Sequence, residues 1–237
     1  MELKVVSTAA GKRIRPDSPT PDLIAWTMEH FANQRLVMTT SFGMEGCALI
    51  DMYASLGKPL TVIYLDTMFF FPETYALRDE MVERYPHVDF VNRGTDLTPE
   101  QQAAQYGDEL WKTDPDQCCK IRKVDPMHNV LVDVDVWITA LRRTQSITRA
   151  HLQVVEWDWQ YQLLKVSPLA AWEREDIWKY VQERNVPYNK LHEQGYPTVG
   201  CTHCTSKVEG SKPGEYSRSG RWKEFNKTEC GLHGEGI

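Results

Sequence analysis

Apolar residues in the first two-thirds of the chain follow two alternating patterns, short continuous runs and positions at helical spacing. The continuous runs predict buried strands over Leu36–Thr40, Thr61–Leu65, Val88–Val91, Val134–Leu141 and Leu163–Val166. The helical spacing predicts helices over Pro21–Gln34, between Gly46 and about Gly57, and over Pro72–Tyr85, Pro99–Trp111 and Glu173–Glu183. Strands that alternate with helices form parallel sheets, so the pattern predicts an α/β fold with a mostly parallel sheet covered by helices on both faces.

The periodic pattern fades after about Asn185. From Gly195 to Ile237 the chain is dominated by Gly, Pro, Ser, Thr and charged residues, which is typical of loops. We expect residues 1–195 to form the α/β body and residues 196–237 to form a loop-rich segment of the same domain. Whatever Cys201 and Cys204 bind is expected to hold this segment in place.

Composition narrows the class of protein. A chain of 237 residues buries enough surface to fold without disulfides. It shows no apolar run of membrane-spanning length and no signal-peptide pattern, so we expect a cytoplasmic protein without a membrane partner. In a reducing compartment, six cysteines indicate metal binding or catalysis rather than disulfides. The net charge of −6 argues against general nucleic-acid binding, so an anionic ligand needs a local group of Lys and Arg.

Five of the six cysteines fall in a pattern that indicates a metal or cluster site plus one free thiol. Cys118 and Cys119 are adjacent, Cys201 and Cys204 form a CxxC motif, and Cys230 stands alone near the C-terminus. Four cysteines can ligate zinc or an iron–sulfur cluster. Side chains of adjacent residues diverge, which favours the separated iron corners of a [4Fe–4S] cluster over one tetrahedral zinc ion. Zinc remains the alternative.

The lone thiol, Cys230, is the strongest candidate for a catalytic residue. The thiolate of a cysteine is its reactive form, and nearby cations such as Lys227, His233 or an incoming arginine would lower the pKa of Cys230. Because Cys230 has no CxxC partner, an external dithiol would have to release any group that it binds. An inert tail cysteine is the alternative. By contrast, Cys47 lies on an apolar helix face and is expected in the core, and His203 is more simply a solvated loop residue than a zinc ligand.

Two turns and three groups of basic residues indicate an anion site. The strand–turn–helix around Ser41–Gly46 presents backbone N–H groups and a helix N-terminus, and Leu65–Thr67 follows the next strand. A tight structural connection is the alternative for the first turn. The basic groups are Lys120, Arg122 and Lys123, then Arg142, Arg143 and Arg149, then Arg218 and Arg221. Arginine binds phosphate and sulfate oxygens bidentately, although solvated surface positions remain the simpler interpretation for Lys120 and Arg122.

Taken together, these motifs resemble one family. Its pattern is carried by Cys118-Cys119, Arg142-Arg143-Thr-Gln-Ser146, Cys201-Thr-His-Cys204, Gly220-Arg-Trp222 and Lys227-Thr-Glu-Cys-Gly-Leu-His233. The set is similar to the assimilatory adenylyl-sulfate reductases of the adenylyl/phosphoadenylyl-sulfate reductase family, from about residue 35 to residue 233. The resemblance implies a nucleotide-binding domain of the adenine nucleotide α-hydrolase type over residues 1–195, followed by a C-terminal segment, 196–237, with cluster ligands and a catalytic tail.

The resemblance also implies an activity and a site. The activity is the thioredoxin-dependent reduction of adenosine 5′-phosphosulfate to sulfite and AMP in sulfate assimilation, through an S-sulfocysteine on Cys230. The ligands of a [4Fe–4S] cluster would be Cys118, Cys119, Cys201 and Cys204. The substrate would be bound by Ser41, Phe42, Gly43, Leu65, Lys123, Arg143, Arg149, Arg218, Arg221 and His233.

Two alternatives stay open on the sequence alone. The same residues could reduce the 3′-phosphorylated nucleotide, although Glu45 would oppose an added phosphate if it faces the ribose. A zinc- or cluster-stabilised nucleotide-binding redox sensor without turnover is the second alternative. The physiological dithiol and the oligomeric state stay open as well, and a homo-oligomer is compatible with the sequence.

Overall fold

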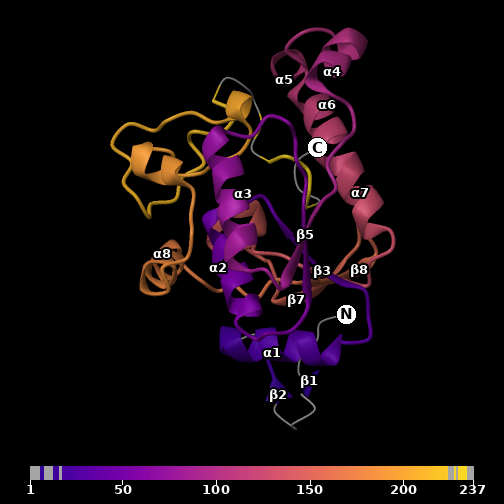
Figure 1. Cartoon of the computed structure of the whole chain (residues 1–237), viewed down its shortest axis with the longest axis vertical. Coiled ribbons are helices and arrows are strands. Elements are labelled where there is room, and N and C mark those ends of the chain that lie inside the picture. The colour runs from indigo at the N-terminus through magenta and orange to yellow at the C-terminus, as the bar shows by residue number, and fades with distance from the viewer. Residues whose placement is uncertain (1–5, 8–12, 16–17, 224–226, 228, 234–237) are drawn as a thin grey trace.

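In the computed structural model, which describes residues 6–7, 13–15, 18–223, 227 and 229–233, a six-stranded sheet forms the centre of the molecule (Figure 1). The strand order is β5-β4-β3-β6-β8-β7, and every pair is parallel except the edge pair of β7 and β8. The strands are β1 (Val6–Ser7), β2 (Arg13–Ile14), β3 (Leu36–Thr40), β4 (Leu60–Tyr64), β5 (Val88–Asn92), β6 (Val136–Ile138), β7 (Val155–Asp158) and β8 (Leu163–Val166). The first two form a separate small hairpin.

Helices pack on both faces of the six-stranded sheet. They are α1 (Thr20–His30), α2 (Met44–Ala54), α3 (Pro72–Arg84), α4 (Pro99–Tyr106), α5 (Leu110–Thr113), α6 (Pro115–Cys119), the π-helix η1 (Lys120–Val124), α7 (Asp125–Leu131) and α8 (Arg174–Glu183). Short 3-10 turns are η2 (Arg143–Gln145), η3 (Ile147–Arg149), η4 (Lys190–Gln194) and η5 (Thr202–Cys204).

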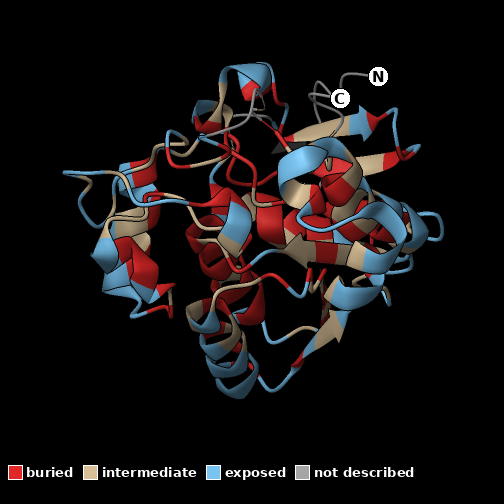
Figure 2. Ribbon diagram, turned by 90° about the horizontal axis from the view of Figure 1, so that it is seen from above, coloured by how far each residue is buried: buried red, intermediate tan, exposed pale blue. Residues whose placement is uncertain are grey.

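Successive side chains of a strand point to opposite faces of the sheet, so each strand packs against helices on both faces. Met38 and Ile138 pack in one cluster with residues of α2, α3 and α8, whereas Trp137 packs with Met127 and Leu131 of α7 on the other face. Buried residues accordingly concentrate at the centre of the molecule (Figure 2). The predicted α/β class with helices on both faces is confirmed.

The strands differ from the predicted ones mainly at the β6–β8 side of the sheet. β6 is shorter than the predicted run Val134–Leu141, because the chain leaves the sheet after Ile138 to form the site described below. The sequence pattern missed β7, an edge strand in which Val155 is half-buried and Trp157 is exposed. Edge strands lack the continuous apolar run of a central parallel strand.

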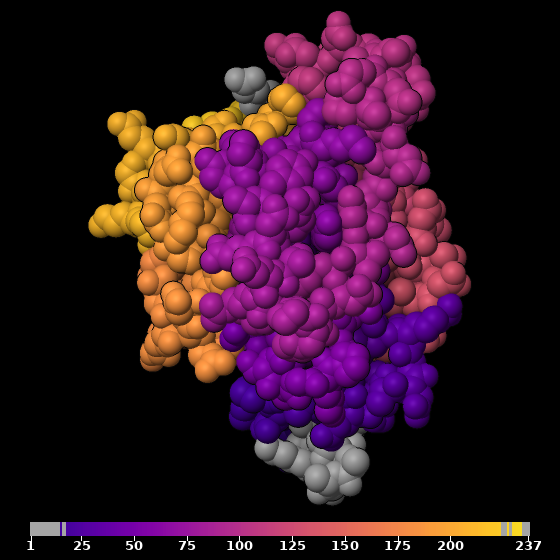
Figure 3. Space-filling view, viewed as in Figure 1, coloured from indigo at the N-terminus to yellow at the C-terminus, as the bar shows by residue number. Residues whose placement is uncertain are grey.

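The C-terminal part of the chain is loop-rich, as expected, and packs along the α/β body (Figure 3). A β-bridge pairs Cys201 with Phe70, and a second bridge pairs Thr205 with Arg221. The first bridge fixes the CxxC motif against the loop that follows β4, and the second joins two parts of the C-terminal segment. Within the described residues, the helices are all too short or too polar to span a membrane.

Candidate active site

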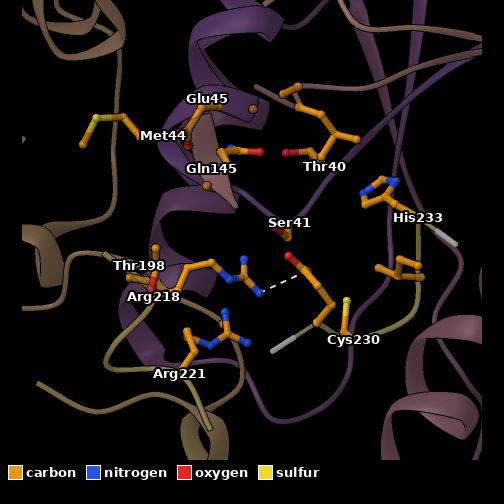
Figure 4. Close-up of a pocket in the computed structure, with 18 of the residues that line it drawn as sticks. Thr40, Ser41, Met44, Glu45, Gln145, Thr198, Arg218, Arg221, Cys230 and His233 are labelled. Carbon is orange, nitrogen blue, oxygen red and sulfur yellow. Dashed lines mark hydrogen bonds and ion pairs between the residues drawn. The ribbon is translucent and has the colours of Figure 1, made fainter. Parts of the chain in front are cut away.

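The carboxyl ends of β3, β4 and β6 open into a cavity of about 240 Å³ (Figure 4). β3 lies between β4 and β6, so the strand order reverses here, and open parallel sheets bind ligands at such a point. Thr40, Leu65 and Thr139, which end or directly follow these three strands, all line the cavity. The sheet therefore places residues from three distant parts of the chain around one opening.

The turn between β3 and α2 forms one wall. Ser41 and Gly43 line the cavity, and Gly43 is the N-cap of α2 without a side-chain cap, so the first amides of the helix are available to an anion. A Cβ on Gly46 would lie 2.6 Å from Thr40 Oγ1, which explains the glycine. Phe42 is not among the lining residues; its side chain is 1% exposed and packs on Tyr64 in the core.

A continuous helical stretch, α6–η1–α7, carries the cysteine pair and Lys123. The sequence pattern did not predict it. Pro126 has no N–H to donate to the carbonyl of Arg122, which interrupts the α-helical bonding where the π-helix η1 occurs. α6 presents Cys118 and Cys119 to a small hollow, and Lys123, one turn later, borders both that hollow and the cavity.

The four cysteines that were grouped from the sequence lie together. Cys118, Cys119, Cys201 and Cys204 are all buried and line the small hollow. Burial, followed by the charge of neighbouring cysteines, raises the pKa of Cys118 to about 12 and that of Cys204 to about 11. Four buried thiolates around one hollow would repel one another unless a cationic group lay between them. These four sulfur donors therefore fit a metal centre. His203 borders the hollow too, but it is exposed and its ring stacks on Trp111 at 3.8 Å.

The basic residues separate into those that reach the cavity and those that do not. Lys123, Arg149, Arg218 and Arg221 line it. A Cβ on Gly200 would lie 2.5 Å from the Arg221 guanidinium, so the glycine makes room for that side chain. Arg143 is not among the lining residues, and its Nε donates to the Leu152 carbonyl at 2.8 Å.

Two cations beside the cysteine pair also lie outside the cavity. Arg122 is 1% exposed, donates to Gln102 Oε1 at 2.8 Å and to the Thr67 carbonyl at 3.0 Å, and has a structural role rather than a solvated one. Lys120 is exposed and pairs with Asp125 at 2.7 Å. Lys123 differs from both: burial would lower its pKa, but the thiolates of Cys201 and Cys119 raise it, so its ammonium stays charged.

Cys230 is half-buried and lines the cavity, together with Leu232 and His233 (Figure 4). The His233 ring stacks on Trp137 with 5.0 Å between centroids. Burial, together with the charges of Arg149 and Lys165, holds the pKa of His233 well below its usual value, so this imidazole is neutral. Lys227 donates to Asp116. Of the cations expected near Cys230, His233 is thus uncharged, whereas the expected arginines are present as Arg218 and Arg221, which line the cavity with Cys230.

Glu45 also lines the cavity, but it does not present a bare negative charge. Its Oε1 pairs with Arg142 Nη2 at 2.8 Å and with Arg174 Nη1 at 3.2 Å. Burial would raise the pKa of Glu45, but the two guanidinium groups outweigh it and lower the pKa to about 2. The argument that Glu45 repels a 3′-phosphate consequently loses its basis, since two cations surround one carboxylate.

This arrangement predicts a pH-dependent stability. A depressed carboxyl pKa stabilises the fold above the unfolded pKa of 4.5 and loses that contribution as pH falls toward about 2. Glu45→Gln should lower the free energy of unfolding at pH 7 by about 3–5 kcal/mol, because it leaves two buried guanidiniums without their carboxylate. Urea unfolding at pH 7 and pH 4 measures the effect, and the difference from wild type should be smaller at pH 4.

The exposed Glu83 on α3 offers a matched control. Glu83→Gln removes the same charge and should leave stability nearly unchanged at both pH values. A Glu45→Gln protein as stable as wild type at pH 7 would show that the two arginines do not depend on Glu45.

Several lining residues could not be found from the sequence. Gln145 accepts from Arg149 Nη1 at 2.6 Å and so orients this arginine. Tyr216 places its ring 5.1 Å from the Arg142 guanidinium. Gln145 lies inside the motif Arg142–Ser146, which was the one available signal; the partners of Tyr216 are remote in sequence.

The chain is similar to known proteins in both sequence and structure. Residues 35–207 match the family described as the phosphoadenosine phosphosulfate reductase domain. A Lysinibacillus sphaericus protein named adenosine 5′-phosphosulfate reductase is 45% identical over 90% of this chain and 89% of its own length. One of the same name from Geobacillus kaustophilus is 44% identical over 90% of this chain and 88% of its own. The crystal structure of a phosphoadenylyl-sulfate reductase from Candida auris, a phosphate complex, is similar with a TM-score of 0.70 and 28% identity, over 81% of this chain and 91% of that chain.

Proposed function

Since this chain belongs to the phosphoadenosine phosphosulfate reductase family, we propose that it reduces adenosine 5′-phosphosulfate to sulfite and AMP, with Cys230 as the nucleophile. The observation that carries the proposal is the convergence of Cys230 with Lys123, Arg218 and Arg221 on one cavity at the carboxyl edge of the sheet. A thiol beside three cations suits an electrophile that bears negative charge.

The first step is a sulfur transfer. The Cys230 thiolate attacks the sulfonate sulfur, a new S–S bond forms, and the bond from that sulfur to the phosphate oxygen breaks. Its electron pair leaves on AMP, and the enzyme carries an S-sulfocysteine. Thiolate and substrate are both anions, so their approach requires positive charge, which Lys123, Arg218 and Arg221 supply in fixed positions. The α2 N-terminus and the ends of β3 and β4 are the proposed adenosine and phosphate seat, with Ser41, Gly43 and Leu65.

The second step requires an external dithiol, for which we propose thioredoxin or a similar protein. One of its thiolates attacks Cys230 Sγ, and sulfite leaves with the S–S bonding pair. The second thiol of the dithiol protein then attacks the mixed disulfide, which releases the Cys230 thiol and leaves the partner as a disulfide. The transferred sulfur is thereby reduced from the oxidation state of sulfate to that of sulfite, and the dithiol is oxidised to a disulfide. A reducing compartment such as the cytoplasm suits this reaction.

We propose a [4Fe–4S] cluster as the group that Cys118, Cys119, Cys201 and Cys204 hold. Support comes from four buried thiols around one hollow and from the adjacency of two of them. Such a cluster would be held by α6 and the C-terminal segment together, and when bound it would contribute to the electrostatic field near the cavity. Among the described His, Cys, Asp and Glu side chains, no three are arranged around a single-ion position. Iron, sulfide and zinc analysis of the purified protein distinguishes cluster from zinc.

The unphosphorylated nucleotide is the proposed substrate because the two curated relatives above are named for it. The solved relative is named for the 3′-phosphorylated nucleotide, which remains the alternative substrate for the same mechanism. Comparing kcat/KM for the two nucleotides decides between them.

The experiment that tests the proposal is a labelling reaction under anaerobic conditions. The protein is mixed with 35S-labelled adenosine 5′-phosphosulfate without reductant. We expect the label to stay on the protein and to leave as sulfite when thioredoxin is added. A protein that binds the nucleotide but never acquires label would overturn the reductase assignment and favour the redox sensor.

A further inference from the structure

The residue before the nucleophile has a partner set that the proposed reaction does not yet explain. Glu229 is 4% exposed, and its Oε2 pairs with Arg149 Nη2 at 3.0 Å and with Arg218 Nη2 at 3.1 Å. Arg149 lies in η3, after β6, whereas Arg218 lies in the C-terminal segment. Figure 4 shows the ion pair from Arg218 reaching toward the tail segment that carries Cys230. A single carboxylate beside Cys230 thus joins the loop after β6 to two parts of the C-terminal segment.

We propose that Glu229 is the positioning residue that holds Cys230 over the reacting sulfur; this inference rests on the proposed function. Consecutive Cα atoms are 3.8 Å apart, so a side chain fixed at Glu229 restricts where the Cys230 thiol can lie. A buried carboxylate between two guanidiniums is a strong and directional anchor. In the structure the Glu229 ion pairs are already formed, so Cys230 needs no further movement of the tail to be held in this position.

Other contacts hold the tail on either side of Cys230. The Tyr161 hydroxyl donates to the Leu232 carbonyl at 3.2 Å, and His233 stacks on Trp137. Lys227 donates to Asp116 on α6. Among these described tail contacts, only that of Glu229 uses arginines that line the cavity. Closure of the tail and the arrangement of the cavity cations are therefore linked through this residue.

The two steps of the reaction make opposite demands on this anchor. Attack on the sulfonate requires Cys230 inside the cavity, while the dithiol must reach the Cys230 sulfur from outside. Weakening the anchor should slow the first step without slowing the second. A residue with only a structural role would not separate the two rates.

Cluster-containing Glu229→Gln enzyme tests the proposal. Transfer of 35S label to Cys230 in a single turnover should slow by about 10²-fold, the effect of a small misplacement of a reacting group. AMP affinity should not fall, and thioredoxin should release the label at least as fast as from wild type. Iodoacetamide should modify Cys230 faster, with Cys230→Ser as the blank. Glu229→Asp, which keeps the charge, should recover part of the transfer rate.

Glu209, exposed in the same C-terminal segment, supplies the matched control. Glu209→Gln should match wild type in transfer, release and modification. Unchanged transfer and modification rates in Glu229→Gln would overturn the proposal. Tighter substrate binding with an unchanged transfer rate would also overturn it, because Glu229 would then only compete with the substrate for Arg149 and Arg218. If wild type itself acquires no label, the proposed function fails, and the iodoacetamide rates still decide whether Glu229 holds Cys230.

Discussion

Cys230→Ser should lose sulfite production while it keeps the iron content and the AMP affinity of the wild type. Serine cannot form the S–S bond through which the dithiol later expels sulfite, so no slower version of the same route remains. We expect a loss on the order of 10⁴- to 10⁶-fold, as for removal of other covalent nucleophiles. The variant should retain its cluster because Cys230 is not among the four cysteines of the hollow. Sulfite release, retained label, iron content and AMP binding measure these properties separately.

Cys47→Ala is the matched control for thiol loss. Cys47 is fully buried on α2, and burial raises the pKa of its thiol far above the usual value. Its predicted core position is confirmed, so Cys47→Ala should still acquire label and produce sulfite. Sustained sulfite production by Cys230→Ser would instead assign the nucleophile to another residue.

The elements that sequence patterns predict well include the central strand of the sheet. β3 occupies the predicted Leu36–Thr40: it lies between β4 and β6, and all five of its residues are buried or half-buried. The α6–η1–α7 stretch is the contrasting case. Pro126 lies inside it, and its residues mix exposed polar side chains with buried cysteines and a buried arginine, so no helical spacing of apolar residues stands out. Cys118 of this stretch packs in one cluster with Cys201 and Cys204, which are remote in the sequence.

The candidate site divides in the same way. The four cysteines could be grouped from their spacing alone. The ion pairs of the two carboxylates could not be predicted, because 97 positions separate Glu45 from Arg142 and 80 separate Glu229 from Arg149. Lys120, Arg122 and Lys123 lie within four positions of one another, and only the family resemblance distinguished Lys123. In the structure Lys120 is solvated, Arg122 is buried with Gln102 and a backbone carbonyl as acceptors, and Lys123 borders the cavity. Helical geometry separates neighbouring side chains by about 100°, so adjacent cations need not share a role.

Lys123→Ala should slow sulfur transfer to Cys230 by about 10²- to 10³-fold, the scale observed when one preorganised donor to a developing charge is removed. Lys123 is the cation that borders both the cysteine hollow and the cavity, and the charge of Cys230 is among those that raise its pKa. Its ammonium therefore lies where two anions must approach each other. Single-turnover labelling measures the transfer rate, and Lys123→Arg, which keeps the charge, should recover part of it.

Lys120 provides the control within the same π-helix, because it is exposed and paired with Asp125. Lys120→Ala removes the same charge about one turn away and should transfer sulfur at nearly the wild-type rate. Iron content must be measured in both variants. Loss of iron from Lys123→Ala would assign the ammonium to retention of the cluster, and equal rates in both variants would mean that net charge, rather than position, assists the reaction. Slow transfer in Lys123→Ala with full iron content would place the effect on the meeting of thiolate and sulfonate, because that is the step at which two negative charges come together.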